Sequence, residues 1–268
     1  MSWALVLGVS SGTGQAAAFR LVQEPGLDIY GVHRGHHRDG AARVAEAAAD
    51  AGRRYVEHLC DGSLPEQIDL ACVDLLEQAG PRSVRFVLHS IASASVGTLV
   101  AGPGPHLAPR QLQRTFDKMA HSFAWWVQAL YRHDLLAPGA HVLGLTNPIG
   151  HSLIRGTAAI TASKAALNAY MRQLAFELGP QGYRVNLLDF GMVESPATQA
   201  TFDAHLRRID HVVRRVTPAG RKVELTEVAD LIALLAGDRL AWFNGAVIDF
   251  TGGEMLAHYD ALVHPERP

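Results

Sequence analysis

Short apolar runs with the character of β-strands alternate with alanine- and leucine-rich stretches of helix length along the whole chain. The expected strands are 4–8, 28–33, 55–59, 83–89, 141–146, 184–190 and 246–250. The expected helices are 13–22, 40–51, 65–78, 109–136, 157–178, 198–216 and 225–236. Strands separated by helices pair in parallel through right-handed crossovers. Nearly continuous apolar strands are typical of a sheet covered on both faces. We therefore expect an α/β fold with a doubly wound parallel sheet of about seven strands.

The length of the chain and its short proline- and glycine-rich segments predict one domain. Its 268 residues and 48% hydrophobic content suffice for one sizeable core. Segments 101–109 and 138–139 are rich in proline and glycine, but they are too short to link two domains. We expect a single domain over residues 1–268, in which residues 254–268 form a C-terminal tail.

Composition excludes several classes of partner. The formal net charge of -2 gives no electrostatic reason to expect nucleic acid or an anionic membrane. No apolar stretch reaches the roughly 18 residues of a membrane span, and the residues after Met1 lack the pattern of a signal peptide. The two cysteines, Cys60 and Cys72, have no metal-like spacing to histidine, so neither a disulfide network nor a metal site is expected. These features predict a cytoplasmic location.

A glycine-rich turn joins the first expected strand to the first helix and reads Gly8-Val9-Ser10-Ser11-Gly12-Thr13-Gly14. Glycines there permit positive φ and a close approach of the backbone to a pyrophosphate, while the helix N-terminus favours its negative charge. A tight structural turn is the alternative explanation. Because the turn follows the first strand of a parallel sheet, we favour a single-domain Rossmann fold that binds a dinucleotide. The predicted contacts from this turn are Gly8, Ser10, Ser11, Gly12 and Gly14.

The segment after the second expected strand bears on which dinucleotide binds. NAD-specific proteins place an acidic residue about 20 residues after the glycine turn, for the ribose 2′-hydroxyl. This chain has Val32-His33-Arg34-Gly35-His36-His37-Arg38 instead. An arginine without a competing carboxylate in its segment suits a 2′-phosphate. We therefore favour NADP(H) over NAD(H), with Arg34 as the phosphate ligand; solvated loop charges are the alternative explanation.

Three motifs in this order resemble the short-chain dehydrogenase/reductase family: the glycine turn, Ala162-Ser163-Lys164, and Ile248-Asp249-Phe250-Thr251-Gly252-Gly253. Two further segments, Leu88-His89-Ser90-Ile91-Ala92 and the stretch 217–224, are similar to enoyl-acyl-carrier-protein reductases of that family. The likeness covers almost the whole chain. It implies an NAD(P)H-dependent oxidoreductase.

The resemblance also implies contacts to the cofactor. Asp61 meets the adenine, and Lys164 hydrogen-bonds the nicotinamide ribose. The backbone around His89, Ser90 and Ile91 lies along the cofactor, and Gly191, Val193 and Ser195 hold the nicotinamide. Taken alone, Asp61 and Ser195 fit a helix cap and a turn residue equally well.

The family's proton-donating tyrosine is missing. Ordinary members carry it four residues before the lysine, where this chain has Ile160, and enoyl reductases seven residues before, where this chain has Thr157. The family's serine corresponds to Asn147, and its helix asparagine to Met119 or a neighbour. Isoleucine cannot transfer a proton and a threonine hydroxyl is a poor acid, so reduction of a carbonyl to an alcohol is not expected.

Other polar residues are candidates for the missing group. His151 lies in the loop expected to rim the site, and an ordinary histidine pKa of about 6.5 suits a proton donor. A solvent-exposed loop histidine is the alternative, and His89 and His121 are further options. Asn147 and Thr157 can donate hydrogen bonds to a developing oxyanion without transferring a proton. The predicted catalytic set is Lys164, Asn147, Thr157 and His151.

Three hypotheses of function stay open at this point. The favoured one is an NADPH-dependent reductase of an activated C=C bond, as in an enoyl thioester, or of a C=N bond. The second is a non-redox enzyme on the same scaffold, such as an isomerase, dehydratase or cyclase, and the third is a nucleotide-binding pseudoenzyme. The retained glycine turn and Lys164 favour the first.

The expected partners are a substrate and further copies of the chain. The substrate is either a small molecule or bound to a carrier protein. In the family the segments 109–136 and 157–178 commonly form the subunit interface, which implies a homo-oligomer. The aromatic residues Phe123, Trp125, Trp126 and Tyr131 are assigned to that interface.

Overall fold

The computed structural model describes residues 2–100, 102, 106–147, 153–256 and 258–264, which build one sheet of seven parallel strands. The strands are β1 (Ser2–Leu7), β2 (Leu27–His33), β3 (Tyr55–Leu59), β4 (Val84–His89), β5 (Leu136–Thr146), β6 (Arg184–Phe190) and β7 (Val247–Phe250). Their spatial order is β3-β2-β1-β4-β5-β6-β7. The order changes direction between β1 and β4, and open α/β sheets bind ligands at such a switch point. The expected doubly wound parallel fold is confirmed.

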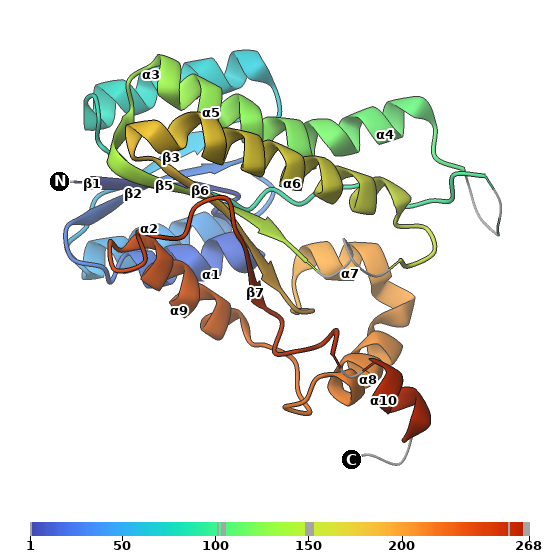
Figure 1. Ribbon diagram of the computed structural model, residues 1–268. Coiled ribbons are helices and arrows are strands. Elements are labelled where there is room, and N and C mark those ends of the chain that lie inside the picture. The colour runs from blue at the N-terminus through green and yellow to red at the C-terminus, as the bar shows by residue number, and fades with distance from the viewer. Residues whose placement is uncertain (1, 101, 103–105, 148–152, 257, 265–268) are drawn as a thin grey trace.

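Helices cover both faces of the sheet (Figure 1). One face carries α3 (Pro65–Ala79), α4 (Pro109–Phe116), α5 (Ser122–Arg132) and α6 (Ala158–Leu178), the last followed by a short 3-10 turn (Gly179–Gln181). The other face carries α1 (Gly12–Leu21), α2 (Arg38–Asp50) and α9 (Leu225–Ala236). A third group lies beyond the carboxyl ends of the strands and consists of α7 (Pro196–Phe202), α8 (Leu206–Val216) and α10 (His258–Val263). Among the described helices none combines the length and apolar character that a membrane span requires.

Strand β1 shows how the sequence builds two cores. Trp3, Leu5 and Leu7 pack into the core under α3, α5 and α6, whereas Ala4 and Val6 pack into the core over α1, α2 and α9. Successive side chains of a strand point to opposite faces, so a strand buried on both sides must be apolar throughout. The buried sheet holds the carboxyl ends of its strands in fixed positions.

The expected helix 109–136 is wrong in its details. α4 ends at Phe116, a π-helical turn (Asp117–His121) follows, and α5 ends at Arg132. Asp134 then adopts a left-handed conformation with φ 50°, and β5 begins at Leu136 instead of residue 141. A π-turn is bonded from i to i+5, and apolar spacing does not distinguish it from an α-helix.

Two aromatic residues that we assigned to a subunit interface lie in the core instead. Phe123 and Trp126 are each 1% exposed, and Trp126 Nε1 donates to the carbonyl of Gly62 at 2.9 Å. Their spacing of three residues places both on the sheet-facing side of α5. Tyr131 is exposed and Trp125 is half-buried, so only these two fit the interface assignment.

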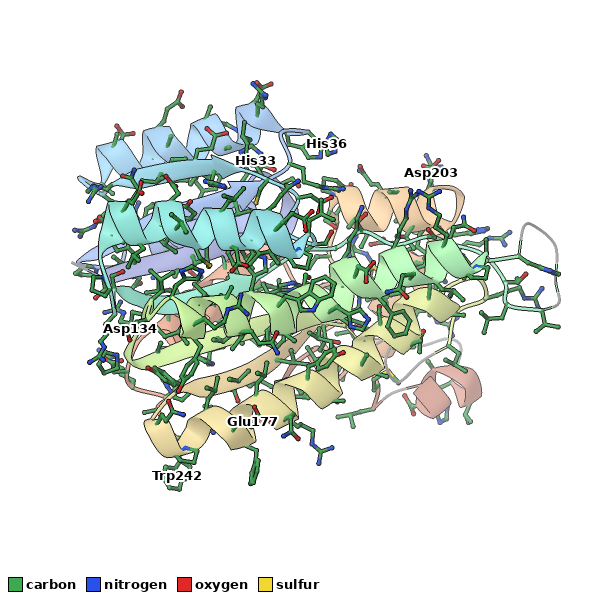
Figure 2. All side chains as sticks on the ribbon, turned by 90° about the horizontal axis from the view of Figure 1, so that it is seen from above. His33, His36, Asp134, Glu177, Asp203 and Trp242 are labelled. Atoms are coloured by element: carbon green, nitrogen blue, oxygen red, sulfur yellow. The ribbon has the colours of Figure 1, made fainter. Side chains whose placement is uncertain are left out.

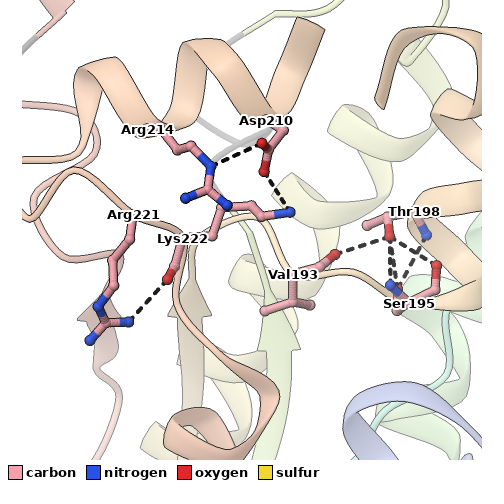
Figure 3. A network of polar contacts seen from close by, with 7 residues as sticks. All are labelled: Val193, Ser195, Thr198, Asp210, Arg214, Arg221 and Lys222. Atoms are coloured by element: carbon pink, nitrogen blue, oxygen red, sulfur yellow. Dashed lines mark hydrogen bonds and ion pairs between the residues drawn. The ribbon is translucent and has the colours of Figure 1, made fainter. Parts of the chain in front are cut away.

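The expected helix 198–216 is two helices separated by a 3-10 turn (Asp203–His205). α7 starts earlier than expected because Ser195 caps it: Ser195 Oγ accepts a hydrogen bond from the Thr198 amide at 3.2 Å. Figure 3 shows this cap close to a second network on α8, in which Asp210 pairs with Arg214 at 2.9 Å and with Lys222 at 2.7 Å. The pair with Arg214 lies within α8, and the pair with Lys222 joins α8 to the loop that leads to α9.

Candidate functional site

A cavity of about 480 Å³ lies at the switch point, where the carboxyl ends of β1 and β4 adjoin. The Ser90 amide after β4 donates to the Leu7 carbonyl at the end of β1, at 2.9 Å, which holds the two strand ends together. Residues that follow β1, β2 and β3 line one side, and residues that follow β4, β5 and β6 line the other. The volume falls in the range of cofactor and substrate sites, roughly 300–1,000 Å³.

The glycine turn leaves the space that a pyrophosphate requires. Gly8 has φ 93°, and a Cβ there would lie 2.6 Å from the Ser90 carbonyl oxygen. A Cβ on Gly14 would lie 2.2 Å from the Gly8 carbonyl oxygen, so Gly14 packs α1 against the turn instead of lining the cavity. The cavity wall at the N-terminus of α1 includes Ser10, Ser11, Gly12 and Thr13. The N–H groups and dipole of a helix N-terminus favour an anion there.

Charged groups gather where the chain leaves β2 and β3. Arg34 Nη1 lies 3.9 Å from Asp61 Oδ2, and Ser63 donates to Asp61 Oδ1 from its amide at 3.1 Å and from its hydroxyl at 2.6 Å. Burial by itself raises the pKa of Asp61, but the hydrogen bonds from Ser63, with Lys118 and Arg34 nearby, bring it below its usual value. Asp61 is therefore an ionised, fixed carboxylate beside two cations. Arg34 and Asp61 both line the cavity, and their contacts to a cofactor stay predictions.

A buried histidine that the motifs did not single out stands beside these charges. Figure 2 shows His33 and His36 at the carboxyl end of β2. His33 Nδ1 accepts from the Gly35 amide at 3.1 Å, so its Nε2 carries the proton and donates to Glu57 at 2.6 Å. The ring is held from both nitrogens and forms part of the cavity wall.

The segment after β4 is placed in part as expected. Ser90 and Ile91 line the cavity, but the His89 side chain is turned into the core and does not. His89 Nε2 hydrogen-bonds Ser122 Oγ at 2.8 Å, and its ring packs edge-on against Phe123. Burial lowers the pKa of His89 to about 3, and Lys164 adds to the effect. His89 is a neutral core residue and not a proton donor to the cavity.

Lys164 lies on α6 with its ammonium group buried beside the cavity. Its Nζ donates to the Leu145 carbonyl on β5 at 2.6 Å, and the residue is 8% exposed. Burial lowers the pKa of Lys164 to about 8, while Asp189 on β6 acts in the opposite direction. A lysine in this position can be charged or neutral near physiological pH.

The other three residues of the predicted catalytic set differ in whether they line the cavity. Asn147 lines the cavity after β5, and its Oδ1 is buried without a hydrogen-bond partner among the described residues. Thr157 is 1% exposed and does not line the cavity, because its hydroxyl donates to the Ile154 carbonyl at 2.7 Å where α6 begins. The prediction of Thr157 as a group that faces the substrate is therefore wrong in this structure. His151 lies outside the described residues.

The segment after β6 lies along the cavity together with a residue from the C-terminal tail. Gly191, Val193 and Ser195 all line it. A Cβ on Gly191 would lie 2.9 Å from Glu254 Oε2, so the bare glycine backbone makes room for this carboxylate. The turn that brings Glu254 here contains two glycines with φ 67° and 79°. In the sequence the pair Gly252-Gly253 indicates a tight turn, but it does not indicate that the turn brings Glu254 to the cavity.

An apolar cluster replaces the polar catalytic positions expected of the family. Met119 from the π-helical turn, Ile160 from α6 and Phe202 from α7 are 4%, 5% and 7% exposed and pack together. All three line the cavity. The sequence identified Met119 and Ile160 as replacements but missed Phe202. It also missed Lys118, next to Met119 on the π-helical turn, which lines the cavity too.

The cavity fits a dinucleotide by its shape and charge. The glycine turn offers a backbone cradle, Arg34 and Lys118 supply positive charge on one side, and Lys164 and Asn147 supply polar groups on the other. Within the described part of the chain, no three histidine, cysteine, aspartate or glutamate residues are grouped to hold a metal ion.

Comparison with known proteins points to one family. Residues 8–254 match the family described as enoyl-(acyl carrier protein) reductase. Over 251 residues the chain is 29% identical to the enoyl-(acyl-carrier-protein) reductase (NADH) FabI of Escherichia coli, covering 87% of this chain and 91% of that protein. It is 24% identical to the 1-cyclohexenylcarbonyl-CoA reductase of Streptomyces collinus, covering 98% of this chain and 93% of that protein.

Solved structures show the same fold. A short-chain dehydrogenase from Burkholderia cenocepacia J2315 in complex with NADP superposes with a TM-score of 0.82 at 24% identity. The match covers 95% of this chain and 98% of that one.

Proposed function

Because the chain belongs to the enoyl-reductase group of the short-chain dehydrogenase/reductase family, we propose that it reduces an activated C=C or C=N bond with NADPH. Proteins of this family are NAD(P)H-dependent oxidoreductases. Both relatives compared above are named as reductases, one of an enoyl-(acyl-carrier-protein) and the other of a 1-cyclohexenylcarbonyl-CoA.

The observation that carries the proposal is the apolar cluster at the reactive side of the cavity. Met119, Ile160 and Phe202 occupy the wall where a proton donor would stand, and none of them holds a transferable proton. General acid assistance is typically worth about 10²–10⁴ in rate, so an alkoxide-forming carbonyl reduction would suffer most from its loss. An iminium carbon needs no proton when hydride arrives. Hydride addition to an enoyl thioester gives an enolate, which hydrogen bonds stabilise until water supplies the proton to its α-carbon.

When bound, the reduced nicotinamide supplies the hydride. The chain's own residues orient the substrate and stabilise the charge that develops on it. Lys164 brings a buried ammonium group to the cavity, and the side-chain amide of Asn147 is available as a hydrogen-bond donor to a substrate oxygen. The apolar cluster excludes water from one wall and packs against an apolar part of the substrate.

The preference for NADPH rests on the end of β2. The segment offers Arg34 to a 2′-phosphate and no carboxylate to a 2′-hydroxyl, as charge-assisted recognition of a phosphate requires. The Burkholderia cenocepacia structure contains NADP, whereas the Escherichia coli enzyme is named for NADH. Because both NADP and NADH are named among similar proteins, the proposed preference for NADPH rests on the charged residues of this chain.

Titration of the purified protein with NADPH and NADH, followed by nicotinamide fluorescence, tests the cofactor part. Addition of enoyl thioesters and cyclic imines to the NADPH complex then tests the reaction. Tight NADPH binding with oxidation by one acceptor class supports the proposal. Absence of binding, or binding without oxidation by any acceptor of either class, counts against it.

We further propose that the chain forms a homo-oligomer through its α4–α6 face. Tyr131 on α5 and Phe176 on α6 are large exposed residues there, at 47% and 78% exposure. Sedimentation of wild type and of Phe176→Ser at micromolar concentration tests this assignment, because loss of the oligomer is expected only if α6 forms the interface.

A further inference from the structure

Lys118 is a cation on the cavity wall that no motif of the sequence accounts for. It lies on the π-helical turn between α4 and α5, one residue before Met119, lines the same cavity as Arg34 and Asp61, and interacts electrostatically with both. Burial, the largest influence, lowers the pKa of Lys118, and Arg34 and Arg114 add to this while Asp61 opposes it. Arg34 and Lys118 are thus two cations that repel each other across one wall of the cavity.

Asp61, the described carboxylate that lines this wall of the cavity, cannot satisfy both cations. Asp61 Oδ1 already accepts two hydrogen bonds from Ser63, and its Oδ2 faces Arg34 at 3.9 Å. Within the described residues, no carboxylate lies within 4.0 Å of the Lys118 ammonium. Among the residues that line this wall, Arg34, Lys118 and Asp61 together leave one net positive charge, whereas Glu57 is hydrogen-bonded to His33 and does not line the cavity. A fixed excess of charge in a partly buried place favours a ligand that brings negative charge.

We infer that Lys118 and Arg34 bind the 2′-phosphate of NADP(H) between them, so that Lys118 is a second determinant of cofactor preference. The inference rests on the proposed use of NADPH. A phosphate monoester carries a charge of about -1.5 to -2 near pH 7 and offers three acceptor oxygens, which suits one guanidinium and one ammonium donor. Arg34 by itself is partly offset by Asp61, and Lys118 restores the attraction.

The neighbouring arginines fit this role less well. Arg38, the second arginine of the segment after β2, lines an adjoining hollow together with Arg43 and does not line the main cavity. Arg114 is exposed on α4 and does not line it either. Of the described lysines and arginines, Lys118 and Arg34 are the two that line the adenosine side, together with His36 and His37.

Binding constants of the variant Lys118→Met test the inference without any substrate. Methionine keeps the length and packing of the lysine stem and removes the charge. We expect the Kd for NADPH, and that for 2′,5′-ADP as competitor, to rise about tenfold or more, and the Kd for NADH and for 5′-ADP to change by less than about threefold. Lys118→Arg retains most of the NADPH affinity. Arg110→Met, two helical turns earlier on exposed α4, is the matched control and leaves all four constants unchanged.

Comparison with Arg34→Met completes the test. If the two cations share one phosphate, the double variant loses less NADPH affinity than the sum of the single losses, since either change leaves the phosphate incompletely paired. Equal weakening of NADPH and NADH by Lys118→Met would overturn the inference, as would unchanged NADPH binding or a wild type that binds NADH as tightly as NADPH. A wild type that binds neither nucleotide would instead remove the proposed function itself.

Discussion

Replacing Lys164 by methionine is expected to stabilise the cofactor-free protein while weakening its affinity for a dinucleotide. Lys164 is buried on α6, and burial lowers its pKa from the ordinary 10.5 to about 8. At 1.36 kcal/mol for each pH unit, keeping this ammonium charged in the folded state at pH 7 costs about 3 kcal/mol. The hydrogen bond from Nζ to the Leu145 carbonyl, which methionine loses, returns about 1 kcal/mol. The net gain for Lys164→Met at pH 7 is about 2 kcal/mol, which raises Tm by roughly 4–8 °C.

The pH dependence of this gain follows from the direction of the pKa shift. Because the folded-state pKa lies below the unfolded value, the unfolded chain binds more protons between about pH 8 and 10.5. Wild-type stability therefore rises relative to the variant as pH increases through that window, and the full cost applies below pH 8. Above pH 10.5 the wild type has recovered the cost, and the advantage of the variant is gone.

Urea unfolding of wild type and Lys164→Met at pH 7, 8.5 and 10 measures the difference directly. Lys222→Met, which removes an ion pair with Asp210, is the control and changes stability by about 1 kcal/mol or less. A Lys164→Met variant that is less stable than wild type by the same amount at every pH would refute the reasoning, since the buried ammonium would then stabilise the fold. A concurrent loss of NADPH binding is expected, because function commonly retains a group at some expense of stability.

Two further predictions concern the glycine turn and acid stability. Gly8→Ala puts an alanine in a left-handed conformation with its Cβ against the Ser90 carbonyl, so it should lower the free energy of unfolding by about 3 kcal/mol and abolish dinucleotide binding. The control Gly26→Ala, with φ 73° and open space around it, should lower it by about 1 kcal/mol and leave binding intact. Thermal unfolding and fluorescence titration measure the two effects. Burial lowers the pKa of His141 from the ordinary 6.5 to about 4, although its hydrogen bond to the Leu235 carbonyl acts in the opposite direction, so the unfolded chain takes up the proton first as pH falls. The stability that depends on neutral His141 is fully present above pH 6.5, and up to about 3 kcal/mol of it is lost as pH falls to 4. Urea midpoints measured across this range should fall for the wild type and change less for His141→Gln.

Much of the fold was predictable because it depends on local pattern. Buried parallel strands must be apolar on both faces, so β1, β2 and β6 stand out in the sequence, and Gly8 marks the turn that follows the first strand. The break at the π-helical turn and the early start of β5 were not predictable, because tertiary packing and one left-handed residue, Asp134, decide them.

Site residues were predictable where the position of the backbone determines whether a residue lines the cavity. They were not predictable where the direction of the side chain determines it. Gly12, Asp61 and Gly191 follow strand ends at the switch point and line the cavity. His89 ends β4 and Thr157 directly precedes α6, yet neither lines the cavity, because one bonds Ser122 and the other the Ile154 carbonyl. These directions follow from which neighbour offers a hydrogen-bond partner, and the sequence does not display its neighbours in space.

Reaction of the protein with deuterium-labelled NADPH and an equal mixture of an enoyl thioester, a cyclic imine and a β-keto thioester tests the central claim most directly. Mass spectrometry of the products locates the transferred deuterium. The apolar cluster of Met119, Ile160 and Phe202 predicts label on the former C=C or C=N carbon and none in a β-hydroxy thioester. Label in the β-hydroxy product would contradict the account, since it would require the proton donor that this wall of the cavity does not supply.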